Sequence, residues 1–336
     1  MNEIPTVTPP TNTFLWFFAK DLIAGTAGGM AGIVAGQPAD TIKVRQQTYV
    51  SSSSGNPLPS SFSMARTMLQ KEGPLSFFRG MVAPLIANAP INALIFTVYG
   101  GIVRHIEDDG NVALVYDEGD VIPEPKKASL VEQLMAGAAG GLTQCVVACP
   151  SELIKIQQQT YPAATPPSTL SLAKLRVAQS GFRVGLFQGW NATMLRDVPA
   201  FGLYFYSYAW FKETFESIVI APGVRSDIKT VNSGSWLVDT LPTFMAGGMA
   251  GVTSWAFTMP CDVIKSTIQA MPATSSAADR RWMHVAKIGV ERNGTAYFFR
   301  GAGPAILRAF PVSAVVFTVY EAVMGVLDKY DVEEYA

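Results

Sequence analysis

The chain has 336 residues, of which 49% are hydrophobic and only 15% are charged. Soluble domains carry about 25% charged residues, so this sequence lacks the polar cover that a water-facing surface needs. Its formal net charge of -1 and its lack of basic runs argue against a nucleic-acid-binding surface.

The sequence indicates neither a metal site nor an enzyme active site. Cys145, Cys149 and Cys261 lie in apolar stretches without a CxxC pair, so we expect them to pack as small apolar residues. The two histidines, His105 and His284, lie near expected helix ends or loops, with no grouping of nucleophile and base. We therefore expect no enzymatic activity and no cofactor apart from bound lipid.

One motif occurs three times, at intervals of about 110 residues. In chain order it is formed by Pro38-Asp40-Lys43, Pro150-Glu152-Lys155 and Pro260-Asp262-Lys265. A Gly/Ala-rich apolar run precedes each copy, and a glutamine follows four residues after each lysine, at Gln47, Gln159 and Gln269. This register indicates a threefold tandem repeat.

A second landmark follows each motif by about forty residues. It reads FFRG, LFQG and FFRG and ends at Gly80, Gly189 and Gly301. A proline lies ten residues after each of these glycines, at Pro90, Pro199 and Pro311. A tyrosine lies nineteen residues after each, at Tyr99, Tyr208 and Tyr320. The repeats are therefore in register over most of their length.

Each repeat predicts a long apolar helix through the motif, a polar loop with a short amphipathic helix, and a second long apolar helix. The six long helices are expected at 18–48, 82–107, 130–160, 190–217, 240–270 and 302–328. A helix of about 20 residues spans a hydrocarbon core of about 30 Å. The sequence thus predicts an all-α membrane protein with six transmembrane helices in three pseudo-threefold helix pairs.

These helices divide the chain into repeats and connecting segments. We expect repeats at 18–106, 129–217 and 239–329, an acidic loop at 107–128, a loop at 218–238, and tails at 1–17 and 330–336. A soluble nucleotide-binding fold is the alternative, because runs such as GTAGGMAG resemble a phosphate-binding loop. No GxGxxG or GxxxxGK[ST] is present, and the glycines recur at helical spacing, which favours close helix packing in lipid.

From about residue 18 to 328 the sequence resembles the mitochondrial carrier family, whose repeats carry Px[DE]xx[KR] and an aromatic-basic-glycine motif. The resemblance implies a barrel of six tilted helices in the mitochondrial inner membrane, with a short matrix helix in each repeat. Both termini would face the intermembrane space. It further implies a monomer that exchanges one small-molecule substrate at a time by alternating access.

The motif charges predict a gate on the matrix side. Charges at membrane depth are costly unless they are paired and face a bundle interior. Around a threefold axis they can pair between repeats, as Asp40 with Lys155, Glu152 with Lys265, and Asp262 with Lys43. The alternative is pairing at i and i+3 within each helix. We also expect helix kinks at Pro38, Pro150 and Pro260. The resemblance implies that these pairs are braced by Gln47, Gln159 and Gln269.

The resemblance also implies a second gate at the opposite end and lipid sites at the matrix end. On the even helices only Lys212 and Glu321 can form a pair of the second gate, so we expect a resting state closed toward the matrix. Backbone amides at helix N-termini can bind phosphate. The ends of the second landmark resemble cardiolipin-binding sites, at Arg79, Gly80, Gly189, Arg300 and Gly301. Gln188 replaces the basic residue in the middle copy, and simple helix capping is the alternative.

The expected substrate contacts lie seven residues beyond each landmark glycine, about 10 Å along the helix. There the even helices carry Ala87-Asn88, Arg196-Asp197 and Arg308-Ala309, which we call the binding level. Unequal side chains at three symmetric positions indicate an asymmetric ligand, and charges at this depth indicate function. The alternative is that Arg196 and Asp197 only neutralise each other, which would leave Arg308 without a partner. A proton leak or a structural protein would not need Arg308.

The substrate is expected to be a small carboxylated cation. The run from Arg196 to Lys212 and the Ser254-Trp255 pair resemble carnitine/acylcarnitine carriers. For carnitine, Arg308 would bind the carboxylate, and Asp197, held by Arg196, would face the quaternary ammonium. That ammonium favours aromatic faces, which could be supplied by Trp255 and Tyr204. Ala87, Ala89 and Ile91 would leave room for an acyl chain.

Basic amino acid carriers are the alternative, followed by carriers of other carboxylated cations such as S-adenosylmethionine. Ornithine carriers have Arg-Glu where this chain has Arg196-Asp197, and an additional acid where it has Ile91. A dibasic amino acid needs a second carboxylate at the binding level, and we expect none there. Carnitine carriers in turn tend to have histidine where this chain has Gln37. The sequence therefore favours carnitine or acylcarnitine over basic amino acids.

Overall fold

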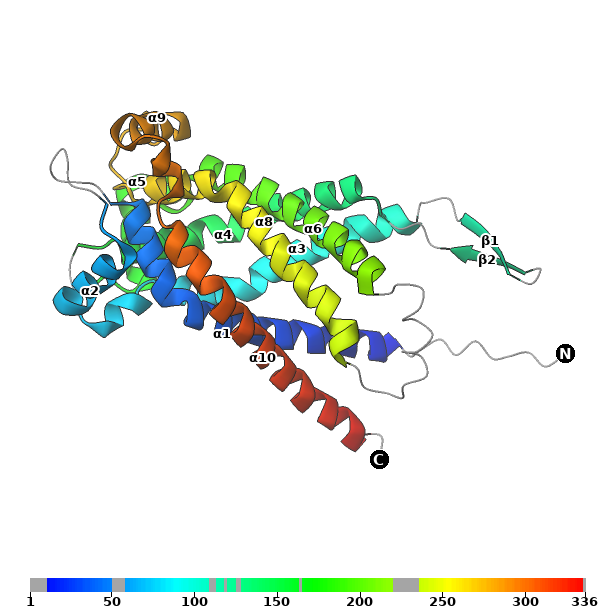
Figure 1. The fold of residues 1–336 in the computed structure, drawn as a ribbon. Coiled ribbons are helices and arrows are strands. Elements are labelled where there is room, and N and C mark those ends of the chain that lie inside the picture. The colour runs from blue at the N-terminus through cyan, green and yellow to red at the C-terminus, as the bar shows by residue number, and fades with distance from the viewer. Residues whose placement is uncertain are drawn as a thin grey trace.

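The computed structural model describes residues 11–49, 58–108, 113–117, 120–124, 128–162, 165–219 and 236–334. Within these ranges six long helices form one bundle (Figure 1). They are α1 (Thr11–Gln47), α3 (Val82–Asp108), α4 (Leu130–Gln159), α6 (Trp190–Val219), α8 (Trp236–Ala270) and α10 (Ala302–Glu334). The predicted all-helical architecture of three helix pairs is confirmed.

The terminal helices extend beyond the predicted boundaries. Helix α1 begins at Thr11 rather than at residue 18, and α10 ends at Glu334 rather than at residue 328. The predicted tails at 1–17 and 330–336 are therefore partly helical. Most of the predicted loop at 218–238 lies outside the described residues.

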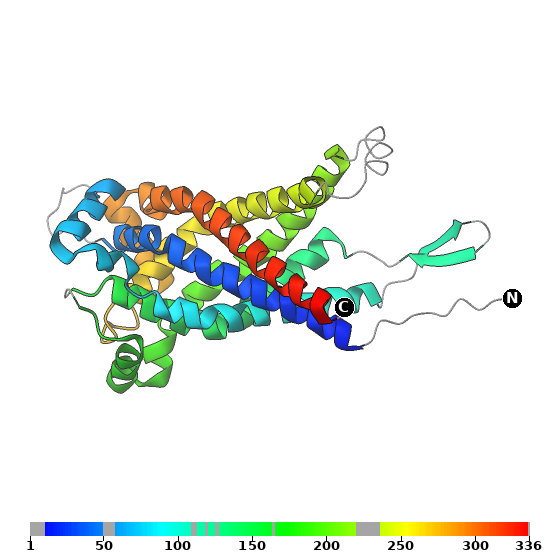
Figure 2. The ribbon, with the colours of Figure 1, turned by 90° about the horizontal axis from the view of Figure 1, so that it is seen from below.

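The loop helices gather at one end of the bundle in both views (Figures 1 and 2). They are α2 (Ser61–Glu72), η1 (Pro74–Phe78), α5 (Thr169–Phe187), α9 (Trp282–Asn293) and η2 (Thr295–Phe299). The start of α1 and the end of α10 both lie toward the opposite end of the bundle. In Figure 2 the start of α8 and the end of α10 diverge on that side of the bundle.

The acidic insertion contains a hairpin, where the sequence analysis expected a loop. Strands β1 (Ala113–Asp117) and β2 (Asp120–Glu124) pair antiparallel, with Ala113 opposite Glu124. The segments LVY and VI within these strands are rich in β-branched and aromatic residues, which favour strands.

Glycines bring the long helices into close contact. A Cβ atom added at Gly28 of α1 would lie 2.8 Å from the carbonyl oxygen of Val316 in α10. A Cβ atom at Gly137 of α4 would lie 2.7 Å from the carbonyl oxygen of Phe201 in α6. Such close approach drives helix association in lipid, where burial from water contributes little. The contacts between helices follow the order α10, α1, α3, α4, α6 and α8 around the bundle.

Some of the helices are long and apolar enough to cross a membrane by length and composition alone. Among the described residues these are Pro74–Glu107 and Leu130–Gln159, and the bent pair Thr295–Arg308 and Pro311–Leu327 would make a third. The pair bends by 42°. Glycine-rich runs, tyrosines and charges lower the hydropathy of the other long helices, since these residues serve helix contacts and the bundle interior.

Two glycines in each repeat have positive φ, at Gly73 and Gly80, Gly181 and Gly189, and Gly294 and Gly301. The second of each pair packs against the motif helix of the next repeat around the bundle. A Cβ atom at Gly80 would lie 2.6 Å from the carbonyl oxygen of Lys155, and one at Gly301 would lie 3.0 Å from that of Lys43. The loops therefore hold the helices that carry the motif lysines.

This packing predicts unequal effects of alanine at two neighbouring glycines. Both Gly73→Ala and Gly80→Ala place a side chain at positive φ, at a cost of about 1–2 kcal/mol. Only Gly80→Ala also meets a backbone atom, because nothing lies within 4 Å of a Cβ atom at Gly73. We expect Gly80→Ala to lower the melting temperature of the purified protein clearly more than Gly73→Ala. Equal losses would contradict the proposed loop-to-helix contact.

Candidate transport site

The three motif acids pair with lysines of neighbouring repeats. Lys155 Nζ lies 2.6 Å from Asp40 Oδ2, and Lys43 Nζ lies 2.7 Å from Asp262 Oδ2. Lys265 forms an ion pair with Glu152. Among the described residues no ion pair joins the acid and the lysine of one motif. The ring of pairs therefore ties α1, α4 and α8 together at the end that carries the loop helices.

The glutamines that follow the lysines have unequal partners. Gln47 Nε2 donates to Asp262 Oδ2 at 2.8 Å and so supports one ion pair directly. Gln159 donates to the hydroxyl of Thr41 at 3.0 Å, and Gln269 to the hydroxyl of Thr193 at 3.4 Å. The expectation that all three brace an ion pair is thus wrong for two of them, because a nearby threonine hydroxyl accepts their amide proton.

The binding-level arginines contact the same carboxylates as the motif lysines. Arg196 Nη2 lies 2.8 Å from Glu152 Oε1, and its Nη1 lies 3.1 Å from Asp262 Oδ1. Arg308 forms an ion pair with Asp40. The expectation that no carboxylate lies near Arg308 is therefore wrong, because a long arginine side chain reaches the neighbouring motif helix. Each motif acid is shared between a lysine and an arginine.

Asp197 points away from the position expected for a substrate cation. Its residue is only 2% exposed. Its Oδ1 pairs with Arg196 and its Oδ2 accepts from Gln144 Nε2 at 2.8 Å. The expectation that Asp197 faces an ammonium group is not supported, since its two oxygens are already engaged by Arg196 and Gln144.

The α3 side of the binding level packs against α1. Ala87 is buried, and Asn88 donates to the carbonyl oxygen of Thr26 at 3.4 Å. Of Ala309 the structure describes only the backbone. On this side the structure thus assigns packing contacts to residues that the sequence placed beside the substrate.

The two aromatic candidates already have aromatic or cationic neighbours. Lys43 Nζ lies 5.6 Å from the ring centroid of Trp255, within the range of a cation–π interaction. Tyr204 stacks with Tyr208 and meets Phe205 edge to face. Trp255 therefore lies beside the ring of motif ion pairs, where a cation is already present.

Sequence reasoning missed Gln144. It lies six residues before Pro150, where the other repeats have Gly32 and Ser254. A polar amide within an apolar Gly/Ala run, at a position filled unequally by the three repeats, was the available signal. The argument that unequal side chains at symmetric positions indicate function applies to this position as well as to the even helices.

The loops of the first repeat contain a cluster of two arginines and one acid. Glu72 lies 2.6 Å from Arg79 Nη1 and also forms an ion pair with Arg45. Hydrogen bonding from Arg45 holds the pKa of Glu72 below the ordinary value, assisted by the charges of Arg45 and Arg79 and opposed by burial. Gln37 donates to the carbonyl oxygen of Arg79 at 2.7 Å. Gln37 thus connects α1 to this loop.

The other landmark side chains are also engaged by the protein. Arg300 donates to the carbonyl oxygen of Tyr49 at 3.1 Å and bonds Asn293. Gln188 donates to the carbonyl oxygen of Ile268 at 2.7 Å and accepts from Arg176 at 2.8 Å. Lipid binding at these positions would therefore rest on backbone amides and on other nearby cations.

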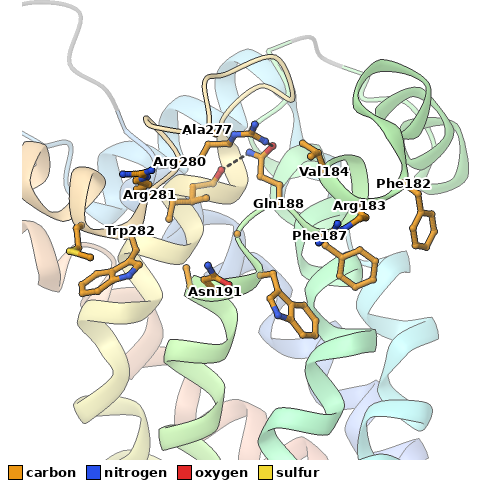
Figure 3. Close-up of a pocket in the computed structure, with 15 residues that line it drawn as sticks. Phe182, Arg183, Val184, Phe187, Gln188, Asn191, Ala277, Arg280, Arg281 and Trp282 are labelled. Atoms are coloured by element: carbon orange, nitrogen blue, oxygen red, sulfur yellow. Dashed lines mark hydrogen bonds between the residues drawn. The ribbon is translucent and has the colours of Figure 1, made fainter.

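A cavity of about 850 Å³ lies beside Gly189, between α5, the start of α6 and the start of α9 (Figure 3). It is lined by aromatic rings and arginines, among them Phe187, Trp282, Arg183, Arg280 and Arg281. The combination of apolar rings, positive charge and a helix N-terminus suits an anionic amphiphile.

The expected second gate lies at the end of the bundle that carries the termini. Among the described residues no ion pair joins Lys212 to Glu321, the one pair expected for a second gate. This is consistent with the divergence of α8 and α10 at that end in Figure 2. In this conformation the described ionic contacts between repeats lie at the loop-helix end.

A family model described as mitochondrial carrier protein matches residues 16–110, 126–218 and 238–331. The chain belongs to this family. It is therefore a membrane transporter of small molecules rather than an enzyme, as the sequence predicts. The three matched segments coincide with the three helix pairs.

Curated relatives align over almost the whole chain. The mitochondrial arginine transporter BAC2 of Arabidopsis thaliana is 36% identical, over 92% of this chain and 92% of the relative. A mitochondrial basic amino acids transporter of Bos taurus is 33% identical, over 91% and 92% respectively. A mitochondrial carnitine/acylcarnitine carrier-like protein of Arabidopsis thaliana is 31% identical, over 90% and 96%.

The Glu72 cluster predicts a pH-dependent contribution to stability. Because the pKa of Glu72 is lowered on folding, its carboxylate stabilises the protein above the ordinary value of 4.5 and loses this effect as pH falls below it. Glu72→Gln should lower the melting temperature by a few degrees at pH 7, since it removes the carboxylate that pairs with Arg45 and Arg79. The difference from wild type should shrink as the pH falls below 4.5 and through the lowered pKa of Glu72.

The control is Glu291→Gln, which removes an exposed acid 3.9 Å from Lys287 on α9. An exposed pair of this kind contributes little, so its melting temperature should match wild type. A deficit of Glu72→Gln that does not shrink when the pH is lowered well below 4.5 would contradict the assigned role of the carboxylate.

Proposed function

We propose that this carrier exchanges basic amino acids, such as arginine, lysine or ornithine, across the mitochondrial inner membrane. The observation that carries the proposal is the sharing of the motif acids with Arg196 and Arg308. The site thereby offers cations for a substrate carboxylate and carboxylates for substrate cations. The 36% and 33% identical relatives named for arginine and basic amino acids support the same substrate class.

The carboxylates favour a dibasic substrate over carnitine. The carnitine hypothesis required Asp197 to face a quaternary ammonium. The Asp197 side chain is buried, and its two oxygens contact Arg196 and Gln144. Glu152 is the most exposed motif acid, with 27% of its side chain accessible against 15% for Asp40. Primary ammonium and guanidinium groups can donate hydrogen bonds to it, whereas a quaternary ammonium cannot.

The proposed mechanism is an exchange of ionic partners. The substrate carboxylate competes with Asp40 for Arg308, and the substrate side-chain cation competes with Arg196 and Lys265 for Glu152. Each exchange weakens one attachment within the ring of motif ion pairs. Substrate binding thereby lowers the free energy needed to separate the motif ion pairs. In the empty carrier the same separation would leave these charges without partners.

Orientation, lipid and oligomeric state form the remaining parts of the proposal. We propose that the loop helices face the matrix, the termini face the intermembrane space, and one chain acts as a monomer because its three repeats complete the ring. Cardiolipin would bind at the landmark glycines Gly80, Gly189 and Gly301, with the cavity beside Gly189 as the best-formed site. Thermal stabilisation by cardiolipin, but not by a zwitterionic lipid, would test that part.

Carnitine or acylcarnitine is the second candidate. It is supported by the 31% identical carnitine/acylcarnitine carrier-like relative. Proteoliposomes loaded with one substrate and exposed to the same labelled substrate outside separate the two candidates. We expect arginine/arginine exchange to exceed carnitine/carnitine exchange at least about tenfold, the discrimination that one unsatisfied charged contact provides. Carnitine exchange at the higher rate would reverse the assignment.

Arg308→Ala should abolish arginine exchange in the same proteoliposomes, because the substrate carboxylate loses its cation. The control is Arg292→Ala, which removes an exposed arginine of α9 and should leave exchange unchanged. Correct insertion of both variants is checked by their accessibility to protease. Normal exchange by inserted Arg308→Ala would refute its role in substrate binding.

A further inference from the structure

Gln144 is a buried amide on α4, which packs against the helix that carries Arg196. It is 2% exposed and lies on α4, one helix away from Arg196. Its Nε2 donates to Asp197 Oδ2 at 2.8 Å and approaches the carbonyl oxygen of Gly141 at 3.3 Å. A buried amide with a charged acceptor is a strong contact, and its loss leaves that acceptor unsatisfied.

We propose that Gln144 is a positioning residue that sets Arg196 for transport. Gln144 occupies one oxygen of Asp197, so that the other oxygen remains for Arg196 Nε. Fixed in this way, Arg196 reaches Glu152 and Asp262, which belong to different repeats. Gln144 therefore acts on the substrate only through Asp197 and Arg196. This inference rests on the proposed function.

The three symmetric positions support a specific role for Gln144. In the first repeat the position is Gly32, which packs closely against Val316 of α10. In the third repeat it is Ser254, which donates to the carbonyl oxygen of Ala200 at 2.6 Å. Gln144 differs from both because its partner is a carboxylate. That carboxylate belongs to the one repeat with Arg-Asp at the binding level.

Packing alone would not require an amide at this position. An apolar side chain of similar length would fill the space on α4 and would avoid burying a polar group. It would leave Asp197 Oδ2 with only the weak Cys145 thiol donor at 3.8 Å, so that both oxygens of Asp197 would compete for Arg196. Arg196 would then be drawn away from Glu152 and Asp262.

The charged groups around Gln144 determine what a glutamate at this position would do. Asp197 Oδ2 lies 3.8 Å from Cys145 Sγ on α4, and Arg196 supplies the adjacent cation on α6. The charges of Arg196 and Lys265 act on this region from α6 and α8, and Cys149 adds a thiol on α4. Glu152 and Asp262 lie beyond Arg196. A carboxyl group in place of the amide can donate to Asp197 only while it carries a proton.

Three variants test the proposal in arginine-loaded proteoliposomes. Gln144→Met removes the donor, and Gln144→Glu makes donation depend on protonation. Gln158→Met is the matched control, because Gln158 is a buried amide on the same helix whose Nε2 donates to the carbonyl oxygen of Pro167 at 2.8 Å. The readouts are Vmax/KM for arginine, its pH profile and the melting temperature of each purified variant.

We expect Gln144→Met to lower Vmax/KM for arginine about tenfold, which corresponds to the loss of one buried hydrogen bond to a charge. Gln158→Met should lower the melting temperature without this loss. Gln144→Glu should exchange arginine almost as wild type at about pH 6 and progressively worse toward pH 8, as its proton is lost.

Two outcomes would overturn the inference: Gln144→Met with the same Vmax/KM as Gln158→Met, or a Gln144→Glu pH profile parallel to that of wild type. Wild-type arginine exchange, measured in the same series, separates this failure from a failure of the proposed function. If wild type exchanges no arginine, the proposed substrate is wrong and the inference, which rests on it, falls with it.

Discussion

The cost of burying charge in an apolar bundle is the constraint on which this structure depends. An unpaired carboxylate or ammonium group is expensive inside a protein and more so at membrane depth. The carrier satisfies each motif acid with more than one donor. Asp40 contacts Lys155 and Arg308, and Asp262 contacts Lys43, Arg196 and Gln47. These shared acids link α1, α4 and α8 at the end of the bundle that carries the loop helices.

The loops take part in the same arrangement. A glycine at positive φ closes each loop against the motif helix of the neighbouring repeat, as Gly80 does against the backbone of Lys155. Movement of a motif helix away from its neighbours must therefore also move a loop. The ionic ring and the loop contacts therefore act together at the end of the bundle that carries the loop helices.

The spacing of the repeated motif predicted the long helices and the three repeats. Together with the family resemblance it also predicted the ring of ion pairs, because the resemblance places the three motifs around one axis. The spacing could not predict how far a flexible side chain reaches. Arg308 was assigned to a level from its position along α10, but its long side chain extends to Asp40 of α1. Gln144 was missed for a related reason, since its significance lies in the orientation of Asp197. The hairpin lies in an insertion that has no counterpart in the other repeats, so the spacing of the repeats could not predict it.

The central claim is that Asp40 and the substrate carboxylate compete for Arg308. Calorimetric binding of arginine to the purified carrier tests it most directly with Asp40→Asn and Lys155→Gln, which each break the same ion pair. We expect Asp40→Asn to bind arginine several-fold more tightly, because Arg308 is released. Lys155→Gln should bind arginine no more tightly than wild type. Without Lys155, Asp40 keeps Arg308 as its ion-pair partner, so Arg308 is not released for the substrate carboxylate. A shift of both dissociation constants by the same factor in the same direction would contradict the account.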